Sequence, residues 1–200
     1  MIYFPLITNK EKQAFTLIEM IVSLGIIMII SVIFIANYNT SNKRTDLIMT
    51  AQSLVADIHA AQNNSLGLVR YGDEVPASGW GVNFNKTNNT YTIFADTDVP
   101  NSYGYRVYTS SKGDTAFGAR QVIISGGLEI EEIKIVLPDS SIRDADNLSI
   151  TFLPPDPKTN IFDQANRAVG NSVTIKLKEV GTNSFKTIRV NFLGLVEIID

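Results

Sequence analysis

The chain reads Phe15-Thr16-Leu17-Ile18-Glu19 at the start of an apolar run that continues to Ala36. About 20 apolar residues are enough for an α-helix to cross a bilayer. Glu19 is the one charged residue inside this run, and an ionised carboxylate at that depth costs about 2.5–3.5 kcal/mol on insertion scales. We therefore expect a membrane helix over residues 15–36, and we expect Glu19 to have a functional role.

Two simpler interpretations of residues 1–36 explain this segment less well. A secretory signal peptide has a shorter apolar region that is followed by a small-residue cleavage site. Here the run is followed by Asn37-Tyr38-Asn39-Thr40-Ser41-Asn42 instead. A plain membrane anchor needs no carboxylate, so that interpretation leaves Glu19 unexplained.

The segment resembles the N-terminus of type IV prepilins and type II secretion pseudopilins. Those proteins begin with a short basic leader that ends in a small residue, and Phe-Thr-Leu-Ile-Glu and a hydrophobic helix follow. Here residues 1–14 correspond to the leader, with Lys10 and Lys12 shortly before Ala14. The resemblance implies cleavage between Ala14 and Phe15 by a prepilin peptidase, followed by N-methylation at Phe15.

The leader departs from the family pattern at two places. The family prefers Gly immediately before the cleaved bond, where this chain has Ala14. The leader also begins with the apolar stretch Met1–Ile7 rather than with polar residues. Efficient cleavage therefore depends on the tolerance of the peptidase for alanine.

Glu19 occupies the position at which the family keeps a glutamate, and its chemistry there can be derived. Cleavage before Phe15 creates an α-ammonium at the start of a helix in lipid. In a stack of staggered subunits, Glu19 of one copy can meet that ammonium on a neighbour. Two isolated charges in lipid then become one compensated pair that also sets the register.

The resemblance implies a structural, non-enzymatic subunit without a cofactor. It would be a minor pilin or pseudopilin of a type IV pilus or a type II secretion pseudopilus, built by packing of N-terminal helices. The implied partners are the prepilin peptidase/methyltransferase, other pilin subunits, the inner-membrane assembly platform and the lipid bilayer.

Lys43 and Arg44 follow the apolar run and balance Lys10 and Lys12, so charge alone leaves the orientation of the helix in the membrane open. The resemblance implies a cytoplasmic N-terminus, a C-terminal domain outside the inner membrane, and a final place in a filament at the cell envelope or surface.

The helix is expected to continue beyond the membrane over residues 37–68. An apolar stripe with helical spacing supports this continuation, and it consists of Leu47, Ala51, Leu54, Ile58 and Ala61. Poor helix formers over residues 37–42 predict a kink or local melting there. We expect the helix to end near Leu66, with Gly67 as its C-terminal cap.

Residues 76–200 have the pattern of short strands separated by turn residues, as in an antiparallel β-sandwich-like domain. We expect strands at Gly81–Phe84, Tyr91–Ala95, Tyr103–Thr109, Gln121–Ser125, Ile130–Leu137, Leu148–Phe152, Val173–Glu179 and Lys186–Ile199. A hairpin turn is expected over residues 181–184, and a loop from residue 153 to about 171. The predicted fold class is α+β, a long N-terminal transmembrane helix followed by this β domain.

A second resemblance concerns the β domain. Gly79-Trp80-Gly81-Val82, then Ile93-Phe94-Ala95-Asp96-Thr97-Asp98, resemble motifs of the GspH/FimT pseudopilin family. Ile188-Arg189-Val190, followed by Gly194-Leu195-Val196, resembles its last strand, although that family often has Gly-Arg where this chain has Gly194-Leu195.

Composition argues against catalysis. The chain has no cysteine and a single histidine, His59, so thiol chemistry, disulfides and thiolate metal sites are excluded. His59 adjoins the apolar stripe and is expected to be an ordinary helix surface residue. The sequence contains neither a Gly-x-Ser-x-Gly elbow nor a phosphate-binding loop.

Three groups of residues are candidates for binding. Asp96, Asp98 and Asn101 have oxygen ligands at a spacing that suits Ca²⁺, although Asx-capped turns use the same residues. Trp80 is either a binding anchor or a core residue, and the core is favoured.

A DNA-contacting face is possible at Lys176, Lys178, Lys186 and Arg189, as in minor pilins of competence or adhesion pili that bind DNA or surfaces. The alternative is an ordinary solvated strand face, because the net charge of −3 does not favour nucleic acid.

Overall fold

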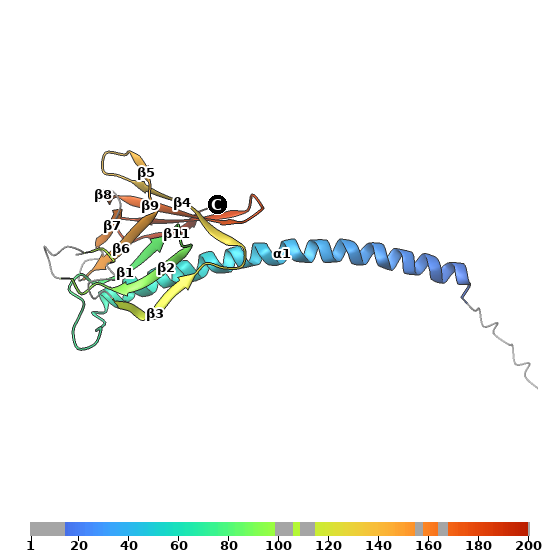
Figure 1. The fold of residues 1–200 in the computed structure, drawn as a ribbon, viewed down its shortest axis with the longest axis horizontal. Helices are drawn as coiled ribbons and strands as arrows, with labels where there is room; N and C mark the ends of the chain where they lie inside the picture. Colours follow the sequence, from blue (N-terminus) through green and yellow to red (C-terminus); the bar gives the residue numbers. More distant parts are fainter. Residues whose placement is uncertain (1–14, 99–105, 109–114, 155–157, 164–167, 200) are drawn as a thin grey trace, which may run out of the picture. The chain divides into compact units, whose positions relative to one another are not determined.

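The computed structural model describes residues 15–98, 106–108, 115–154, 158–163 and 168–199. The chain forms two compact units, Met1–Asn42 and Lys43–Asp200. One helix, α1 (Leu17–Leu66), contributes to both of them (Figure 1). The β-strands all belong to the second unit.

The first unit contains the apolar part of α1. Among the residues that the structure describes, Leu17–Ile35 is long and apolar enough to cross a membrane. Each side chain from residue 15 to residue 35 is exposed. Residues 36–42 are helical, so the local melting predicted for residues 37–42 does not occur.

The apolar stripe on α1 belongs to the hydrophobic core of the second unit. Leu47 is 2% exposed, and Ala51, Leu54, Ile58 and Ala61 are fully buried. Asp57 is also buried on this side of the helix, where its carboxylate accepts a hydrogen bond from the Tyr91 hydroxyl at 2.8 Å. The stripe and this polar contact fix the helix against β2 (Thr90–Ala95).

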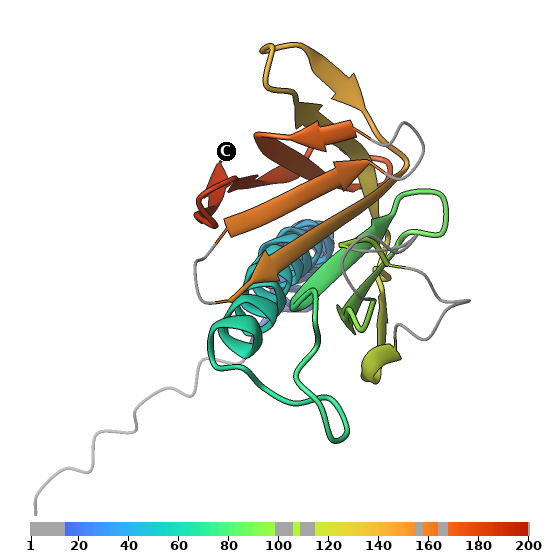
Figure 2. The same ribbon diagram turned by 90° about the vertical axis from the view of Figure 1, so that its left-hand side faces the viewer.

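Two antiparallel sheets complete the second unit (Figure 2). The six-stranded sheet has the order β3 (Thr115–Ile123), β2 (Thr90–Ala95), β1 (Trp80–Asn85), β6 (Asn147–Leu153), β7 (Lys158–Asp163) and β8 (Ala168–Gly170). The five-stranded sheet has the order β11 (Val196–Ile199), β10 (Phe185–Asn191), β9 (Ser172–Glu179), β4 (Leu128–Val136) and β5 (Ile142–Asp144). The predicted α+β class with two sheets is therefore confirmed.

One hydrophobic core is shared by α1 and both sheets. Strand β9 shows how the sequence builds it, because Val173, Ile175 and Leu177 are buried while the residues between them are half-exposed. This alternation places one face of the sheet on the core and the other face toward solvent.

The C-terminal strand prediction is wrong in one respect. Residues 186–199 form two strands, β10 and β11, and not a single strand. The turn between them depends on Asn191, whose side-chain oxygen accepts hydrogen bonds from the backbone N–H groups of Leu193 and Leu195. Gly194 adopts φ +82° in this turn, a conformation that favours glycine.

The prediction of a loop over residues 153–171 is also wrong, because these residues include β7 and β8. Strand β5 was not predicted, and β3 begins at Thr115, before the predicted start at Gln121. The predicted strand Tyr103–Thr109 is not found over residues 106–108, and its other residues lie outside the described ones.

Helix α1 ends at Leu66, as predicted, but the capping residue differs. Leu68, and not Gly67, adopts the left-handed conformation, with φ 51°. The N–H of Leu68 donates to Ser65 O at 3.1 Å and the N–H of Val69 donates to Asn64 O at 2.9 Å. These two bonds form a Schellman motif with Leu68 at the position usually taken by glycine.

Candidate functional site

The start of α1 brings together the residues of the predicted processing site. Phe15 and Thr16 precede the helix, and Phe15 is 77% exposed. The Thr16 hydroxyl accepts a hydrogen bond from the Glu19 N–H at 3.3 Å, so Thr16 is the N-cap and Glu19 is the third helical residue. This is the residue spacing of a capping box. Ala14 lies outside the described residues.

Glu19 lies in the first turn of α1, where a carboxylate interacts favourably with the helix dipole. Its side chain is exposed, and it has no ion-pair partner within the described part of the chain. The Ser23 hydroxyl, one turn further along the helix, donates to the backbone carbonyl of Glu19 at 2.7 Å. This hydrogen bond does not involve the Glu19 carboxylate. A cation from outside the chain can therefore reach Glu19.

Three of the four basic residues proposed for DNA contact lie on the outer face of the five-stranded sheet. Lys176 and Lys178 lie two residues apart on β9 and therefore share one face of the sheet. Arg189, on β10, pairs with Thr174 of β9 and points to the same face. Lys186 lies opposite the buried Leu177. Lys186 therefore belongs to the other face of the sheet.

The three outer-face cations are paired with carboxylates. Glu131 Oε2 lies 2.8 Å from Lys176 Nζ, and Glu131 Oε1 lies 2.7 Å from Lys178 Nζ. Arg189 Nε donates to Glu197 Oε1 at 2.6 Å. The face is therefore locally neutralised and offers a weak electrostatic footprint for DNA, whose binding depends on uncompensated cations.

Glu131 owes its position to an irregularity in β4. The pairing of β4 with β9 shifts register between Ile130 and Glu132, and the extra residue presents its carboxylate to both lysines. Their hydrogen bonds lower the pKa of Glu131 from 4.5 to about 2. In return, the hydrogen bond to Glu131 raises the pKa of Lys178.

Asp96 and Asp98, two of the three residues predicted to bind calcium, form hydrogen bonds within the chain. Asp96 is fully buried, and its two carboxylate oxygens accept hydrogen bonds from the backbone N–H groups of Asp98, at 3.0 Å, and Arg106, at 2.6 Å. Asn101 lies outside the described residues. The geometry at Asp96 and Asp98 is that of an Asx turn, the alternative considered from the sequence.

Trp80 lies in the core and His59 lies on the surface of the helix, as expected from the sequence. Trp80 is 1% exposed, its Nε1 donates to Val69 O at 3.0 Å, and its ring meets Tyr71 edge to face. His59 is exposed, and its Nδ1 lies 3.3 Å from Gln62 Oε1. Trp80 is thus a core residue that closes the loop after α1.

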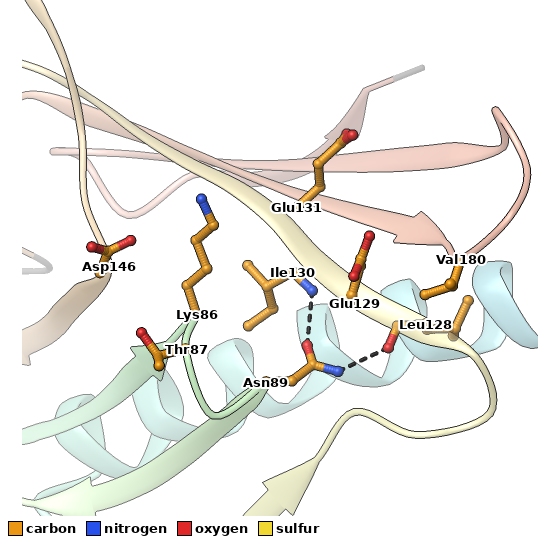
Figure 3. A pocket seen from close by; sticks show the side chains of 9 residues that line it. All are labelled: Lys86, Thr87, Asn89, Leu128, Glu129, Ile130, Glu131, Asp146 and Val180. Atoms are coloured by element: carbon orange, nitrogen blue, oxygen red, sulfur yellow. Dashed lines mark hydrogen bonds between the residues drawn. The ribbon is translucent and has the colours of Figure 1, made fainter.

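A cleft of about 460 Å³ opens where the β1–β2 turn meets β4 (Figure 3). Its charged groups come from Lys86, Glu129, Glu131 and Asp146. Asn89 forms one wall, and its side chain donates to Leu128 O and to Ile124 O, each at 2.8 Å. No group of three potential metal ligands occurs among the residues that the structure describes. Sequence reasoning missed Asn89, although an Asn at a strand turn is a recognisable candidate for a positive φ.

Comparison with known proteins gives one match. A family model described as the prokaryotic N-terminal methylation motif matches residues 9–35. No curated protein and no solved structure matches the chain. The match covers the segment around Phe15 and the apolar part of α1, and it supports a type IV prepilin-like protein with a pilin- or pseudopilin-like role.

Proposed function

We propose that the chain is a minor pilin or pseudopilin that is cleaved between Ala14 and Phe15, methylated at Phe15 and assembled into a filament through its N-terminal helix. The observation that carries the proposal is the unequal burial of α1. The side chains from Leu47 to Ala61 that form the stripe are buried in the second unit, whereas every side chain from Phe15 to Ile35 is exposed. A helix that is apolar all round needs lipid or other apolar helices around it.

The local geometry at the start of α1 supports processing at Phe15. Phe15 and Thr16 lie outside the helix, so cleavage before Phe15 removes no helical hydrogen bond. Thr16 remains to cap the helix through the Glu19 N–H. The processed chain therefore begins with an α-ammonium one residue before an intact N-cap.

The position of Glu19 supports the proposed pairing between subunits. The new ammonium on Phe15 and the Glu19 carboxylate lie about one helical turn apart in sequence, so an axial offset of that size brings the two groups of neighbouring copies together. Each group is costly alone in lipid. Pairing across the helix interface would select one stagger among many.

We also propose that the β domain is of the GspH/FimT type, on the resemblance of its Gly-Trp-Gly motif, and the structure gives this motif a physical role. Gly79 adopts φ +79°, and a Cβ there would overlap the carbonyl oxygen of Phe152. A Cβ on Gly81 would press on the Ile150 carbonyl and the Phe94 ring. Trp80 between them fills the core. The motif is therefore needed to bring β1 against its neighbours.

Assembly of Glu19 variants tests the proposed function. We expect Glu19→Gln to insert in the membrane and to be processed, but to enter filaments poorly, because the amide carries no charge to pair with the ammonium. Glu19→Asp is the matched control, since it keeps the charge on a shorter side chain and should retain part of the assembly. Recovery of sheared filaments measures assembly, and membrane fractions analysed in parallel measure insertion and processing. Normal assembly of Glu19→Gln would refute the pairing.

A further inference from the structure

The start of α1 is defined by two hydrogen bonds to one residue, Thr16. The Thr16 hydroxyl accepts a hydrogen bond from the backbone N–H of Glu19 at 3.3 Å, and the Thr16 carbonyl accepts one from the N–H of Met20 at 3.3 Å. Both are the contacts of an N-cap residue. Phe15 and Thr16 themselves lie outside the helix, which begins at Leu17. The helix therefore begins on the C-terminal side of the Ala14–Phe15 bond.

The sequence just before this bond has no residue that disfavours a helix. Residues 10–14 are Lys, Glu, Lys, Gln and Ala, and each of these residue types has a high helix propensity. Alanine, which adjoins the bond as Ala14, has the highest propensity of all. The intrinsic preference of this segment would therefore extend α1 across the bond.

A competing start for the helix lies further upstream in the sequence. Thr8 and Glu11 have the Thr-x-x-Glu spacing of a capping box. The sequence thus offers two helix starts, one on each side of the Ala14–Phe15 bond. A start at Thr8 would enclose the bond in the helix, whereas the start at Thr16 leaves it outside.

The choice of start matters for hydrolysis of the bond. Water adds across the amide, which gives a carboxylate on Ala14 and an α-ammonium on Phe15. In an α-helix the backbone N–H and C=O groups are hydrogen-bonded to residues four positions away. A helical bond must open before a protease can cleave it, so the rate of cleavage follows the population of the open form.

We propose that Thr16 is a positioning residue for this hydrolysis, because its hydroxyl caps α1 and keeps the Ala14–Phe15 bond outside the helix, where a peptidase can bind it. Thr16 acts through the backbone and does not contact the reacting atoms. This inference rests on the cleavage in the proposed function. It gives the chain a physical means of remaining a substrate with Ala14 beside the cleaved bond.

Cleavage of the full chain in membrane vesicles by the prepilin peptidase of its own host tests the proposal. Intact mass follows the loss of residues 1–14, and initial rates at low substrate concentration give kcat/KM. Thr16→Ala removes the capping oxygen, and Thr16→Ser keeps it. Ser23→Ala is the matched control, because the Ser23 hydroxyl donates to the Glu19 carbonyl within the helix and takes no part in the cap.

We expect Thr16→Ala to lower kcat/KM about two- to fivefold, since the loss of an N-cap shifts the helix equilibrium by about fivefold. Thr16→Ser and Ser23→Ala should cleave at the wild-type rate. Ala14→Gly places a weak helix former beside the bond, so in that background Thr16→Ala should change kcat/KM by less than about 1.5-fold.

Wild-type kcat/KM in Thr16→Ala would overturn the positioning role and leave the proposed function standing. An equal loss in the presence and absence of Ala14→Gly would mean that the peptidase contacts the Thr16 hydroxyl directly, which also overturns a role through the backbone. A wild-type chain that is not cleaved would overturn the proposed processing and the positioning role together.

Discussion

The side-chain oxygen of Asn89 accepts a hydrogen bond from the backbone N–H of Ile130 at 2.8 Å, and this contact joins the six-stranded sheet to the five-stranded sheet. Asn89 ends the β1–β2 turn with φ 53°, and Ile130 lies in β4. The same amide donates to two further backbone carbonyls of the β3–β4 region. The Asn89 side chain therefore satisfies three backbone groups, and two of them, on Leu128 and Ile130, lie in β4 of the other sheet (Figure 3).

Asn89→Ala should destabilise the chain by about 2–3 kcal/mol, because it leaves partly buried backbone groups unsatisfied. Denaturant unfolding followed by Trp80 fluorescence measures the loss, since Trp80 is the only tryptophan and is buried. Asn89→Asp is the matched control, because it keeps the acceptor for Ile130 and removes the two donors. We expect it to lie between the wild type and Asn89→Ala. An unchanged unfolding midpoint in Asn89→Ala would contradict the role of this residue in joining the sheets.

Glu131 should make stability depend on pH in the acidic range. Lys176 and Lys178 lower its pKa to about 2 in the folded chain, compared with an ordinary value of 4.5. The folded state therefore binds the proton less readily than the unfolded state. The stabilisation is fully present above about pH 4.5 and is lost as pH falls toward 2.

Glu131→Gln should flatten the stability profile between pH 4.5 and 2, as measured by unfolding midpoints at several pH values. Glu129→Gln is the control, because Glu129 lies two residues away on β4 but does not accept the two lysine hydrogen bonds. We expect that control to keep most of the acidic slope. An identical slope in wild type and Glu131→Gln would show that the lysine pairs do not act in solution.

Leu68→Gly should stabilise the chain by about 1 kcal/mol. Leu68 has φ 51° and is 52% exposed, so glycine relieves backbone strain and removes little buried area. Leu66→Gly is the matched control, since Leu66 is the last helical residue and glycine there lowers helix propensity. The thermal midpoint should rise for the first variant and fall for the second. A fall in both would mean that the Leu68 side chain matters more than its backbone conformation.

Gly79→Ala should be far more disruptive than Gly181→Ala. Both glycines have positive φ, at +79° and +83°, but only a Cβ on Gly79 would overlap other atoms, those of Phe152 and Ser65. We expect about 1 kcal/mol for Gly181→Ala and more than about 3 kcal/mol for Gly79→Ala, because β1 must shift. Expression level and unfolding midpoint distinguish them. Equal effects would mean that the sheet accommodates the added carbon.

Features that depend on local periodicity could be read from the sequence. The helical stripe from Leu47 to Ala61 and the alternation of Val173, Ile175 and Leu177 both follow from one-sided burial. The turn at residues 192–195 was missed because Phe192 and Leu193 have strand-like character, while the turn depends on the side chain of Asn191. Strands β7 and β8 lack a clear alternation, and pairing with β6 stabilises them.

The candidate site shows the same division. The segment from Phe15 to Glu19 is contiguous, so its spacing was visible at once. Lys186 and Arg189 lie three residues apart on β10, so strand alternation alone already places them on opposite faces of the sheet. The pairing of Glu131 with Lys176 and Lys178 depends on contacts between β4 and β9. Such long-range register cannot be deduced from residue spacing along one strand.

The N-terminus of the mature protein tests the central claim most directly. Intact mass and N-terminal sequencing should be performed on protein extracted from the membranes of its own host. The account predicts a chain that begins with N-methylated Phe15 and lacks residues 1–14. A chain that retains Met1, in a host with an active prepilin peptidase, would contradict processing and with it the filament role.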